Sequence, residues 1–119
     1  MVLVDTSVWV SHLRSGEATL EELLLNLDVC CHPFIVGELA CGRIGNREEV
    51  LSLLRELPPL PVVDLEEFLH FLGAHQLAGT GLGFVDVHLL ASASLADVPL
   101  WTADKKLAAT AHDLDLSFA

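Results

Sequence analysis

Positive charge is scarce in this 119-residue chain. It has six lysines and arginines against 17 aspartates and glutamates, which gives a formal net charge of −11 at pH 7 with histidine counted as neutral. Proteins that bind nucleic acid hold the phosphate backbone mainly with lysine and arginine. Taken alone, the charge argues against a nucleic-acid partner, and such a function would need a local group of cations.

Long hydrophobic runs are also missing. The richest apolar segment, residues 23–31, is interrupted by Asn26 and Asp28, whereas a membrane-spanning helix needs about 20 apolar residues. The first residues lack the basic segment and the small-residue cleavage site of a signal peptide. We therefore expect a cytoplasmic protein with no membrane partner.

The cysteines and histidines lack the spacing of a zinc site. Cys30, Cys31 and Cys41 cannot all pair internally, and adjacent cysteines rarely bond to each other. The six histidines form no ligand pattern such as H-E-x-x-H. We expect the cysteines to be small buried residues and most histidines to lie at the surface or in an interface.

What the chain has in abundance is apolar residues in short segments. They make up 52% of the sequence, the mean hydropathy is +0.52, and this excludes a disordered protein. At this length we expect a single domain, residues 1–119. Apolar runs predict strands at residues 2–5, 29–31, 60–63 and 99–102, with a possible edge strand at 116–118.

Amphipathic or apolar segments between these runs predict helices at residues 6–14, 17–28, 33–42, 46–57, 84–96 and 104–112. A further helix follows a capping box of Asp64 and Glu67, with an apolar stripe of Leu65, Phe68, Leu69 and Leu72. Thr6 or Ser7 is available to cap the first helix. Strands that alternate with helices predict a three-layer α/β/α sandwich with a short central parallel sheet.

Four acids lie in segments that otherwise resemble core: Asp5, Glu38, Asp86 and Asp104. A lone buried carboxylate costs several kcal/mol unless another group compensates it. Asp5 and Asp104 follow predicted strands, so they meet at one sheet edge if those strands are neighbours. Helical spacing places Glu38 and Asp86 on apolar faces, and we expect both to point toward the sheet.

A divalent cation would explain why these acids gather. Two carboxylates about 4 Å apart repel each other by roughly 4 kcal/mol at an effective dielectric constant near 20, and a helix dipole offsets only about 0.3–1 kcal/mol. Mg²⁺ or Mn²⁺ prefers oxygen ligands and supports phosphate chemistry. The alternative is four unrelated capping or surface acids, but Glu38 lies in mid-helix and caps nothing.

Four segments together resemble the motifs of a known family. They are residues 4–9 (VDTSVW), 37–39 (GEL), 83–91 (GFVDVHLLA) and 100–105 (LWTADK), in this order along the chain. On these segments the sequence resembles a PIN domain, specifically the VapC-type ribonuclease toxins of type II toxin–antitoxin systems. The resemblance covers essentially the whole chain.

The resemblance implies an endoribonuclease that depends on Mg²⁺ or Mn²⁺ and hydrolyses RNA phosphodiesters. On that basis Asp5, Glu38, Asp86 and Asp104 hold the metal and form the catalytic site. Thr6 and Ser7 would assist by hydrogen bonding, and Thr102 would orient Asp104. The resemblance also implies a homodimer and a cognate antitoxin protein. The alternative is a catalytically weak or inactive PIN-like interaction module.

The few cations must then serve RNA binding locally. Five of the six follow one of the four acids closely in sequence: Arg14, Arg43, Arg47, Lys105 and Lys106. Because charge is screened over about 8 Å at physiological salt, a local basic rim outweighs distant acidic charge. We predict that this rim contacts RNA, with Arg14, Arg43 and Lys105 as the leading candidates.

Other readings explain the sequence less well. A receiver domain needs an acidic pair after the first strand, and an Asp-x-Asp phosphatase needs a second aspartate at the position of Ser7. The Gly79–Gly83 segment lacks the spacing of a phosphate-binding loop. Trp9 and Trp101 could stack on bases, but both lie in apolar runs and we expect them in the core.

Overall fold

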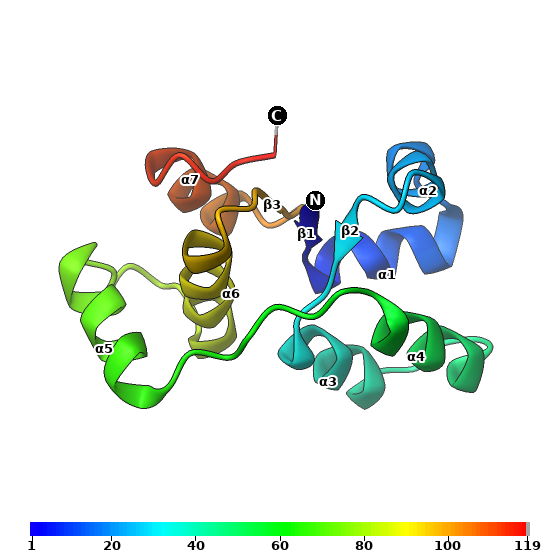
Figure 1. Ribbon diagram of the computed structural model, residues 1–119, viewed down its shortest axis with the longest axis horizontal. Coiled ribbons are helices and arrows are strands. Elements are labelled where there is room, and N and C mark those ends of the chain that lie inside the picture. Colours follow the sequence, from blue (N-terminus) through cyan, green and yellow to red (C-terminus); the bar gives the residue numbers. More distant parts are fainter. Residues whose placement is uncertain (119) are drawn as a thin grey trace.

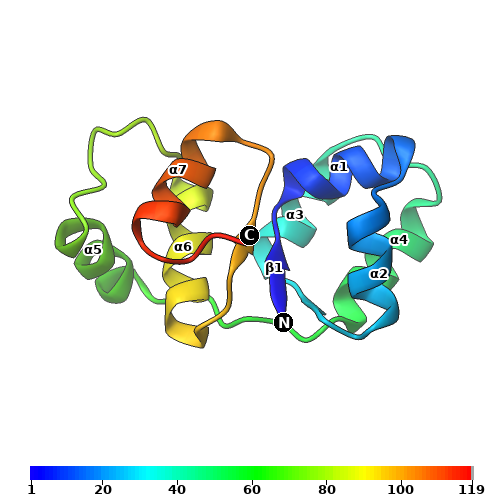
Figure 2. The ribbon, with the colours of Figure 1, turned by 90° about the horizontal axis from the view of Figure 1, so that it is seen from above.

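The computed structural model describes residues 1–118. Its elements in chain order are β1 (Val2–Val4), α1 (Thr6–Ser15), α2 (Ala18–Leu25), β2 (Val29–Cys30), α3 (Pro33–Cys41), α4 (Arg47–Glu56), α5 (Leu65–Ala74), α6 (Phe84–Ala96), β3 (Leu100–Trp101) and α7 (Lys105–Asp113). The strands lie in the middle, with α1 to α4 toward one end of the molecule and α5 to α7 toward the other (Figures 1 and 2). None of these helices combines the length and the hydrophobicity that a bilayer crossing requires.

The sheet is parallel and has the strand order β2-β1-β3. Leu3 of β1 pairs with Cys30 on one side and with Leu100 on the other. All three residues of β1 are buried, as expected for the central strand of a parallel sheet that is covered by helices. The first strand and the strand near residue 100 are therefore neighbours in the sheet, which was the condition for Asp5 and Asp104 to lie at one sheet edge.

The core gathers around β1 and α6. Trp9 of α1 is 1% exposed, which confirms its predicted place in the core, whereas Trp101 is only partly buried. Residues 87–93 of α6 are buried in succession, because this helix is apolar on nearly all sides. A helix of this kind positions its first turn precisely, and that turn carries Asp86.

Two predicted strands are wrong. Residues 60–63 form no strand, and this segment contributes only an isolated parallel bridge between Pro59 and Cys31. Prolines at positions 58, 59 and 61 lack the N–H that a continuing ladder requires. The C-terminal segment likewise contributes only a bridge between Ser117 and Leu100.

Two predictions about helices also need correction. The N-cap of α1 is Asp5, whose side chain accepts from the Ser7 N–H, and not Thr6 or Ser7. The capping box of α5 is confirmed, but its predicted stripe does not face the core as a whole. Leu65 is 68% exposed and Leu69 is 53% exposed, and among the stripe residues only Phe68 is buried.

His32 and His88 are buried, whereas His70, His75 and His112 are exposed, as expected for most of the histidines. Nδ1 of His32 accepts from the Phe34 N–H at 3.0 Å, so its N–H must be on Nε2. Nε2 then donates to Ser92 Oγ at 3.1 Å, and the Ser92 hydroxyl donates to the Pro61 carbonyl at 2.8 Å. This chain of bonds joins α3, α6 and the segment before α5.

The cysteines are free thiols. Cys30 and Cys31 are buried as predicted, whereas Cys41 is exposed, contrary to the prediction. Burial raises the pKa of the Cys31 thiol to about 11 and also raises the pKa of Cys30. The two buried thiols therefore stay protonated and act as small apolar residues.

Candidate active site

The strand order brings the ends of β1 and β3 together, and with them Asp5 and Asp104. Of the four predicted acids only Asp5 is buried, at 7% exposure. Asp86 is half-buried, while Glu38 and Asp104 are exposed. The expectation of four buried carboxylates is therefore wrong. Three of the acids sit where the fold opens to solvent, which lowers the cost of their charge.

Asp5 is held by a small network of hydroxyl groups. Its Oδ2 accepts from the Ser7 hydroxyl at 2.7 Å and from the Thr102 hydroxyl at 2.8 Å. The Ser7 N–H also approaches the same oxygen at 3.4 Å. These donors satisfy one oxygen of the buried carboxylate and fix its orientation.

The same hydroxyls reach the segment that carries Asp104. Thr102 Oγ1 accepts from the Asp104 N–H at 3.0 Å, and Ser7 Oγ accepts from the Ala103 N–H at 3.0 Å. Asp104 is the N-cap of α7, and its Oδ1 accepts from the Leu107 N–H at 2.9 Å. Thr102 thus connects the carboxylate of Asp5 with the backbone of Asp104.

Glu38 joins the site through α1. It lies on an exposed part of α3 and does not point into the sheet as predicted, because the buried residues of that helix are Ile35 and Leu39. Its Oε1 accepts from the Thr6 hydroxyl at 2.6 Å. Since Thr6 directly follows Asp5, this bond ties Glu38 to the end of β1.

Asp86 lies in the first turn of α6, and its Oδ2 accepts from the Gly83 N–H at 3.1 Å. Burial raises the pKa of the Asp86 carboxyl, the negative charges of Asp5 and Asp104 raise it further, and the Gly83 hydrogen bond opposes them. Asp86 therefore lies close enough to Asp5 and Asp104 for their charges to oppose its ionisation. The Gly83 contact was not predicted from the sequence, although a glycine three residues before an acid at a helix start signals it.

The four carboxylates share one pattern of hydrogen bonding. In each, one oxygen accepts from the protein: Oδ2 of Asp5, Oε1 of Glu38, Oδ2 of Asp86 and Oδ1 of Asp104. Within residues 1–118 the second oxygen of each carboxylate accepts no hydrogen bond from the protein. No Lys or Arg in this part of the chain forms an ion pair with the four acids, since the ion pair found among these residues joins Met1 to Asp28. Free carboxylate oxygens without a counter-charge suit a hard divalent cation.

The carboxylates do not yet form a closed cage. In the described part of the chain, no three His, Cys, Asp or Glu side chains are grouped closely enough to hold an ion. Like charges without a cation between them repel, so a bound cation would have to draw these side chains closer. The donor chemistry fits Mg²⁺ or Mn²⁺.

The basic residues divide into two groups. Arg14 and Arg43 line a common cavity of about 250 Å³, formed between α1 and the segment that follows α3. Arg47 instead donates to the carbonyl groups of Ala40 and Gly42, and so caps the end of α3. Lys105 is exposed directly after Asp104. Arg47 is therefore removed from the predicted basic rim, because its guanidinium group is used within the protein.

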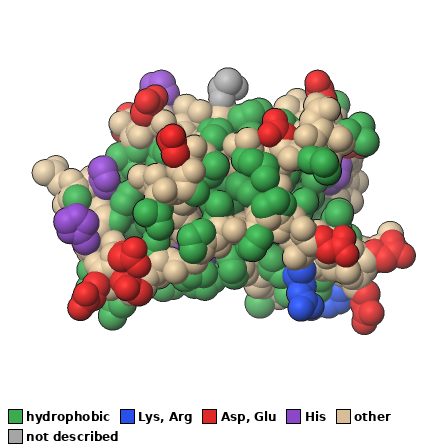
Figure 3. All heavy atoms as spheres, viewed as in Figure 1, with side chains coloured by type: hydrophobic (Ala, Val, Ile, Leu, Met, Phe, Trp, Pro, Cys, Tyr) green, Lys and Arg blue, Asp and Glu red, His purple; other side chains and the backbone are tan. Residues whose placement is uncertain are grey.

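Lys106 and Arg55 do not add to a continuous basic rim around the acids. The Lys106 side chain packs over Gly81, where a Cβ would collide with it. Arg55 lines two hollows with α4 residues, away from the four acids. On the face drawn in Figure 3, Lys and Arg atoms gather at the lower right, while acidic atoms are scattered over several elements.

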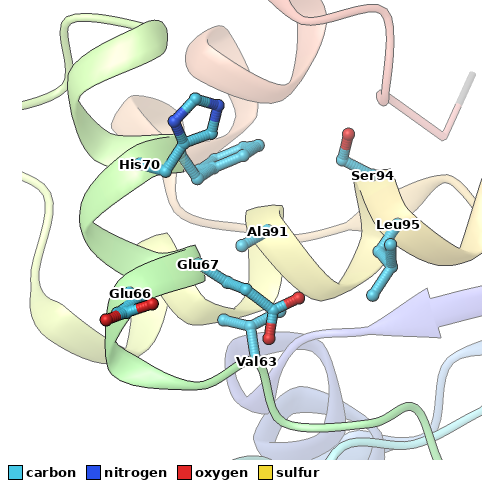
Figure 4. A pocket seen from close by; sticks show the side chains of 8 residues that line it. Val63, Glu66, Glu67, His70, Ala91, Ser94 and Leu95 are labelled. Carbon is cyan, nitrogen blue, oxygen red and sulfur yellow. The ribbon is translucent and has the colours of Figure 1, made fainter.

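Another cavity, of about 400 Å³, lies between α5 and α6. Figure 4 shows its lining, in which Glu66, Glu67 and His70 of α5 face Ala91, Ser94 and Leu95 of α6. None of the four predicted acids contributes to it. The cavity is therefore separate from the four acids.

Comparison with known proteins identifies the family. The family model of the PIN domain matches residues 2–113. The chain belongs to the PIN domain family. This PIN domain is 46% identical over 120 residues to Ribonuclease VapC32 of Mycobacterium tuberculosis (strain H37Rv), a match that covers 100% of this chain and 97% of the relative. The VapC32 of strain CDC 1551 / Oshkosh matches to the same extent.

A solved structure supports the fold of this PIN domain. The crystal structure of PAE2754 from Pyrobaculum aerophilum superposes with a TM-score of 0.65 at 18% sequence identity, and the match covers 92% of this chain and 83% of that one. The predicted three-layer α/β/α sandwich is thereby confirmed. The resemblance to VapC-type PIN domains is confirmed by the full-length similarity to VapC32.

Proposed function

We propose that this PIN domain is an endoribonuclease that hydrolyses RNA phosphodiesters with the help of Mg²⁺ or Mn²⁺, and that it is the toxin of a toxin–antitoxin pair. The observation that carries the proposal is the shared pattern of the four acids, each with one oxygen oriented by the protein and one left free. The similarity to a protein named Ribonuclease VapC32 supports the choice of RNA as substrate.

In this proposal Asp5, Glu38, Asp86 and Asp104 hold the metal. The ion would supply an activated water and neutralise the charge that develops on the phosphate. The chain's own groups prepare the ligands. Ser7 and Thr102 fix Asp5 through its Oδ2, and the remaining acids are each oriented by one further donor.

Thr6, Ser7 and Thr102 act in this proposal as positioning residues. Thr6 orients Glu38 by donating to its Oε1. Ser7 donates to Asp5 and also accepts from the backbone of the segment before α7. Partners of this kind commonly change metal affinity or activity by about 10- to 100-fold when they are removed.

Arg14, Arg43 and Lys105 are the proposed RNA contacts. Arg14 and Arg43 share a cavity and have no acidic partner among residues 1–118, so their guanidinium groups are free to bind phosphate. Lys105 directly follows Asp104 in the chain. Three local cations offset the general acidity only near the site, because charge is screened over about 8 Å at physiological salt.

The proposal includes protein partners. We infer a cognate antitoxin from the similarity to VapC32, and the net charge of −11 suits a basic antitoxin segment. We also infer a homodimer. The exposed Leu65 and Leu69 of α5 and the exposed Leu95 of α6 support it, since large apolar side chains at the surface mark interaction faces. A single domain over residues 1–119 and a cytoplasmic location complete the proposal.

The test is RNA cleavage by purified protein with Mg²⁺, with Mn²⁺ and with EDTA. We expect Asp5→Asn and Asp86→Asn to abolish cleavage, because each removes a charged ligand while keeping the size of the side chain. Asp97→Asn is the matched control, since Asp97 is an exposed residue with φ of 56°, a conformation that asparagine also tolerates. Calorimetric titration of Mn²⁺ into each variant reports ligand loss independently of activity.

Cleavage that persists in both site variants would contradict the assignment of the metal ligands. A wild-type protein that binds its antitoxin but cuts no RNA with either ion would instead favour the inactive interaction module.

A further inference from the structure

Phe84 is an exposed aromatic side chain at the start of α6, two residues before Asp86. It is 59% exposed, yet its ring is braced by other rings. It stacks on Phe34 of α3 with the ring centroids 6.1 Å apart and the planes at 29°. His88 meets it edge-on at 4.5 Å, and Phe68 lies at 5.1 Å. The ring is therefore held in place while much of its surface stays open to solvent.

A hollow of about 340 Å³ begins at this ring and extends to Glu38, one of the four acids. Phe84 and Phe34 form one part of its lining, and Glu38 forms another. Gly37 also lines it, and no atom lies within 4 Å of the position where a Cβ would be, so the helix surface is open there. The volume falls in the range of about 300–1,000 Å³ that is usual for small-ligand pockets.

We propose that this hollow binds a nucleobase of the RNA next to the scissile phosphate, with Phe84 as the stacking surface. The inference rests on the proposed function, and it adds a substrate-binding residue outside the four acids. The residues that line the hollow include no lysine or arginine, so it is not built for phosphate. An aromatic face beside a candidate metal ligand suits a base whose own phosphate lies at the metal.

The charge of the protein favours a contact that does not depend on cations. Most RNA-binding proteins gain affinity from phosphate contacts by lysine and arginine, but this chain has six cations for 119 residues and a net charge of −11. Of these six, Arg47 already caps α3. Stacking of a base on an aromatic ring adds affinity without charge, and it accepts any base because every base has a π face.

A segment of a protein partner is the competing occupant of the hollow. A partner helix uses a long apolar groove with anchors several turns apart, whereas the lining of this hollow comes from the nine-residue helix α3 and from the first two residues of α6. Its lining also includes Glu38, one of the proposed metal ligands. Both observations favour a single base over a peptide segment.

The experiment measures binding of a fluorescein-labelled single-stranded RNA oligonucleotide in EDTA, where metal-dependent cleavage is absent. Phe84→Leu keeps an apolar side chain but removes the π face, and Phe84→Trp keeps the π face. Phe71→Leu is the matched control, because Phe71 of α5 also packs against a histidine, His75, at 4.6 Å. Thermal unfolding shows that each variant is folded.

We expect Phe84→Leu to weaken binding by roughly ten- to a hundredfold, and Phe84→Trp and Phe71→Leu to bind as the wild type does. Oligonucleotides with one abasic nucleotide at successive positions identify the stacked base. The abasic position that matters to the wild type should not matter to Phe84→Leu. With Mg²⁺ present, KM for the same RNA should rise more than kcat falls.

Three results would overturn the inference. One is unchanged RNA affinity and KM in a folded Phe84→Leu variant. Another is the same loss in Phe84→Leu and Phe71→Leu, which indicates a general structural effect. The third is weakened antitoxin binding with RNA binding intact, which assigns the hollow to a protein. The proposed function fails separately, if the wild type does not cleave RNA.

Discussion

Thr102 offers a sharp test of how the site is built, because one hydroxyl serves two of the proposed ligands. It donates to Asp5 Oδ2 at 2.8 Å and accepts from the Asp104 N–H at 3.0 Å. Replacement by valine keeps the branched shape and removes both bonds. We expect Thr102→Val to bind Mg²⁺ more weakly and to cleave RNA more slowly.

The size of the effect follows from the groups that lose a partner. A hydrogen bond to a charged group contributes about 1.5–3 kcal/mol, and about 1.4 kcal/mol corresponds to a factor of ten. Water can replace Thr102 at the Asp104 N–H, since Asp104 is exposed. Asp5 keeps its bond from Ser7, so it is not left without a donor. We therefore expect a loss of roughly 10- to 100-fold and not complete inactivation.

The assay is the Mg²⁺ concentration that gives half-maximal cleavage, together with the rate at saturating Mg²⁺. Thr102→Ser retains the hydroxyl and should restore much of the wild-type behaviour. Thr110→Val is the control in α7, where the Thr110 hydroxyl donates only to the Lys106 carbonyl at 3.2 Å. If Thr102→Val has the Mg²⁺ requirement and rate of the wild type while Asp5→Asn is inactive, Thr102 does not position Asp5.

Other parts of the molecule give three further predictions. Arg43→Glu should weaken RNA binding several-fold and reduce its salt dependence, measured by fluorescence anisotropy at two salt concentrations; unchanged values would remove Arg43 from the RNA contacts. Burial, and secondarily the charge of His88, lower the pKa of His32 to about 4 in the folded chain. In the unfolded chain His32 binds a proton near pH 6.5, so between these two pH values only the unfolded chain is protonated at His32. The free energy of unfolding should then fall by roughly 2 kcal/mol from pH 7.5 to pH 5. His88, whose pKa is also lowered by burial, should add a smaller decrease. An unfolding free energy that does not change with pH in urea titrations would contradict this. Ser92→Ala should lower the free energy of unfolding by about 1–3 kcal/mol, because it leaves buried hydrogen-bond partners unsatisfied. Ser94→Ala, at an exposed position, should change it by less than about 0.5 kcal/mol. Similar urea midpoints for the two variants would argue against a stabilising role of the hydrogen bonds from His32 through Ser92 to Pro61.

The sequence predicted the order and type of the elements best where periodicity was strong. The apolar segment 84–96 became α6 with the predicted bounds, because a helix that is apolar on all sides has few other ways to fold. The prediction of a strand at residues 60–63 failed, because two prolines precede this apolar run and Pro61 lies within it, so it lacks N–H groups that a strand needs. The pairing of β1 with β3 depended on the whole chain, and the sequence could only state it as a condition.

For the candidate site, the sequence predicted four acids as metal ligands, but it did not predict how their side chains are placed. Helical spacing put Glu38 on the apolar face of its helix, but a helix face spans many degrees, and the structure leaves Glu38 exposed. Phe84 was hidden within an apolar run, because its exposure depends on where α3 and α5 pack. Contacts between elements, such as the hydroxyl of Thr6 on Glu38, cannot be read from spacing along one element.

Asp5 shows how closely the fold and the proposed chemistry depend on each other. It ends the central strand, caps α1 through its side chain, and offers its second oxygen at the sheet edge. Asparagine is as good an N-cap as aspartate, so Asp5→Asn removes the charge but retains the cap. Alanine removes both and should cost about 1 kcal/mol more in stability. The comparison of these two variants therefore separates the folding role of this residue from its role as a proposed metal ligand, which no single substitution at Asp5 can do.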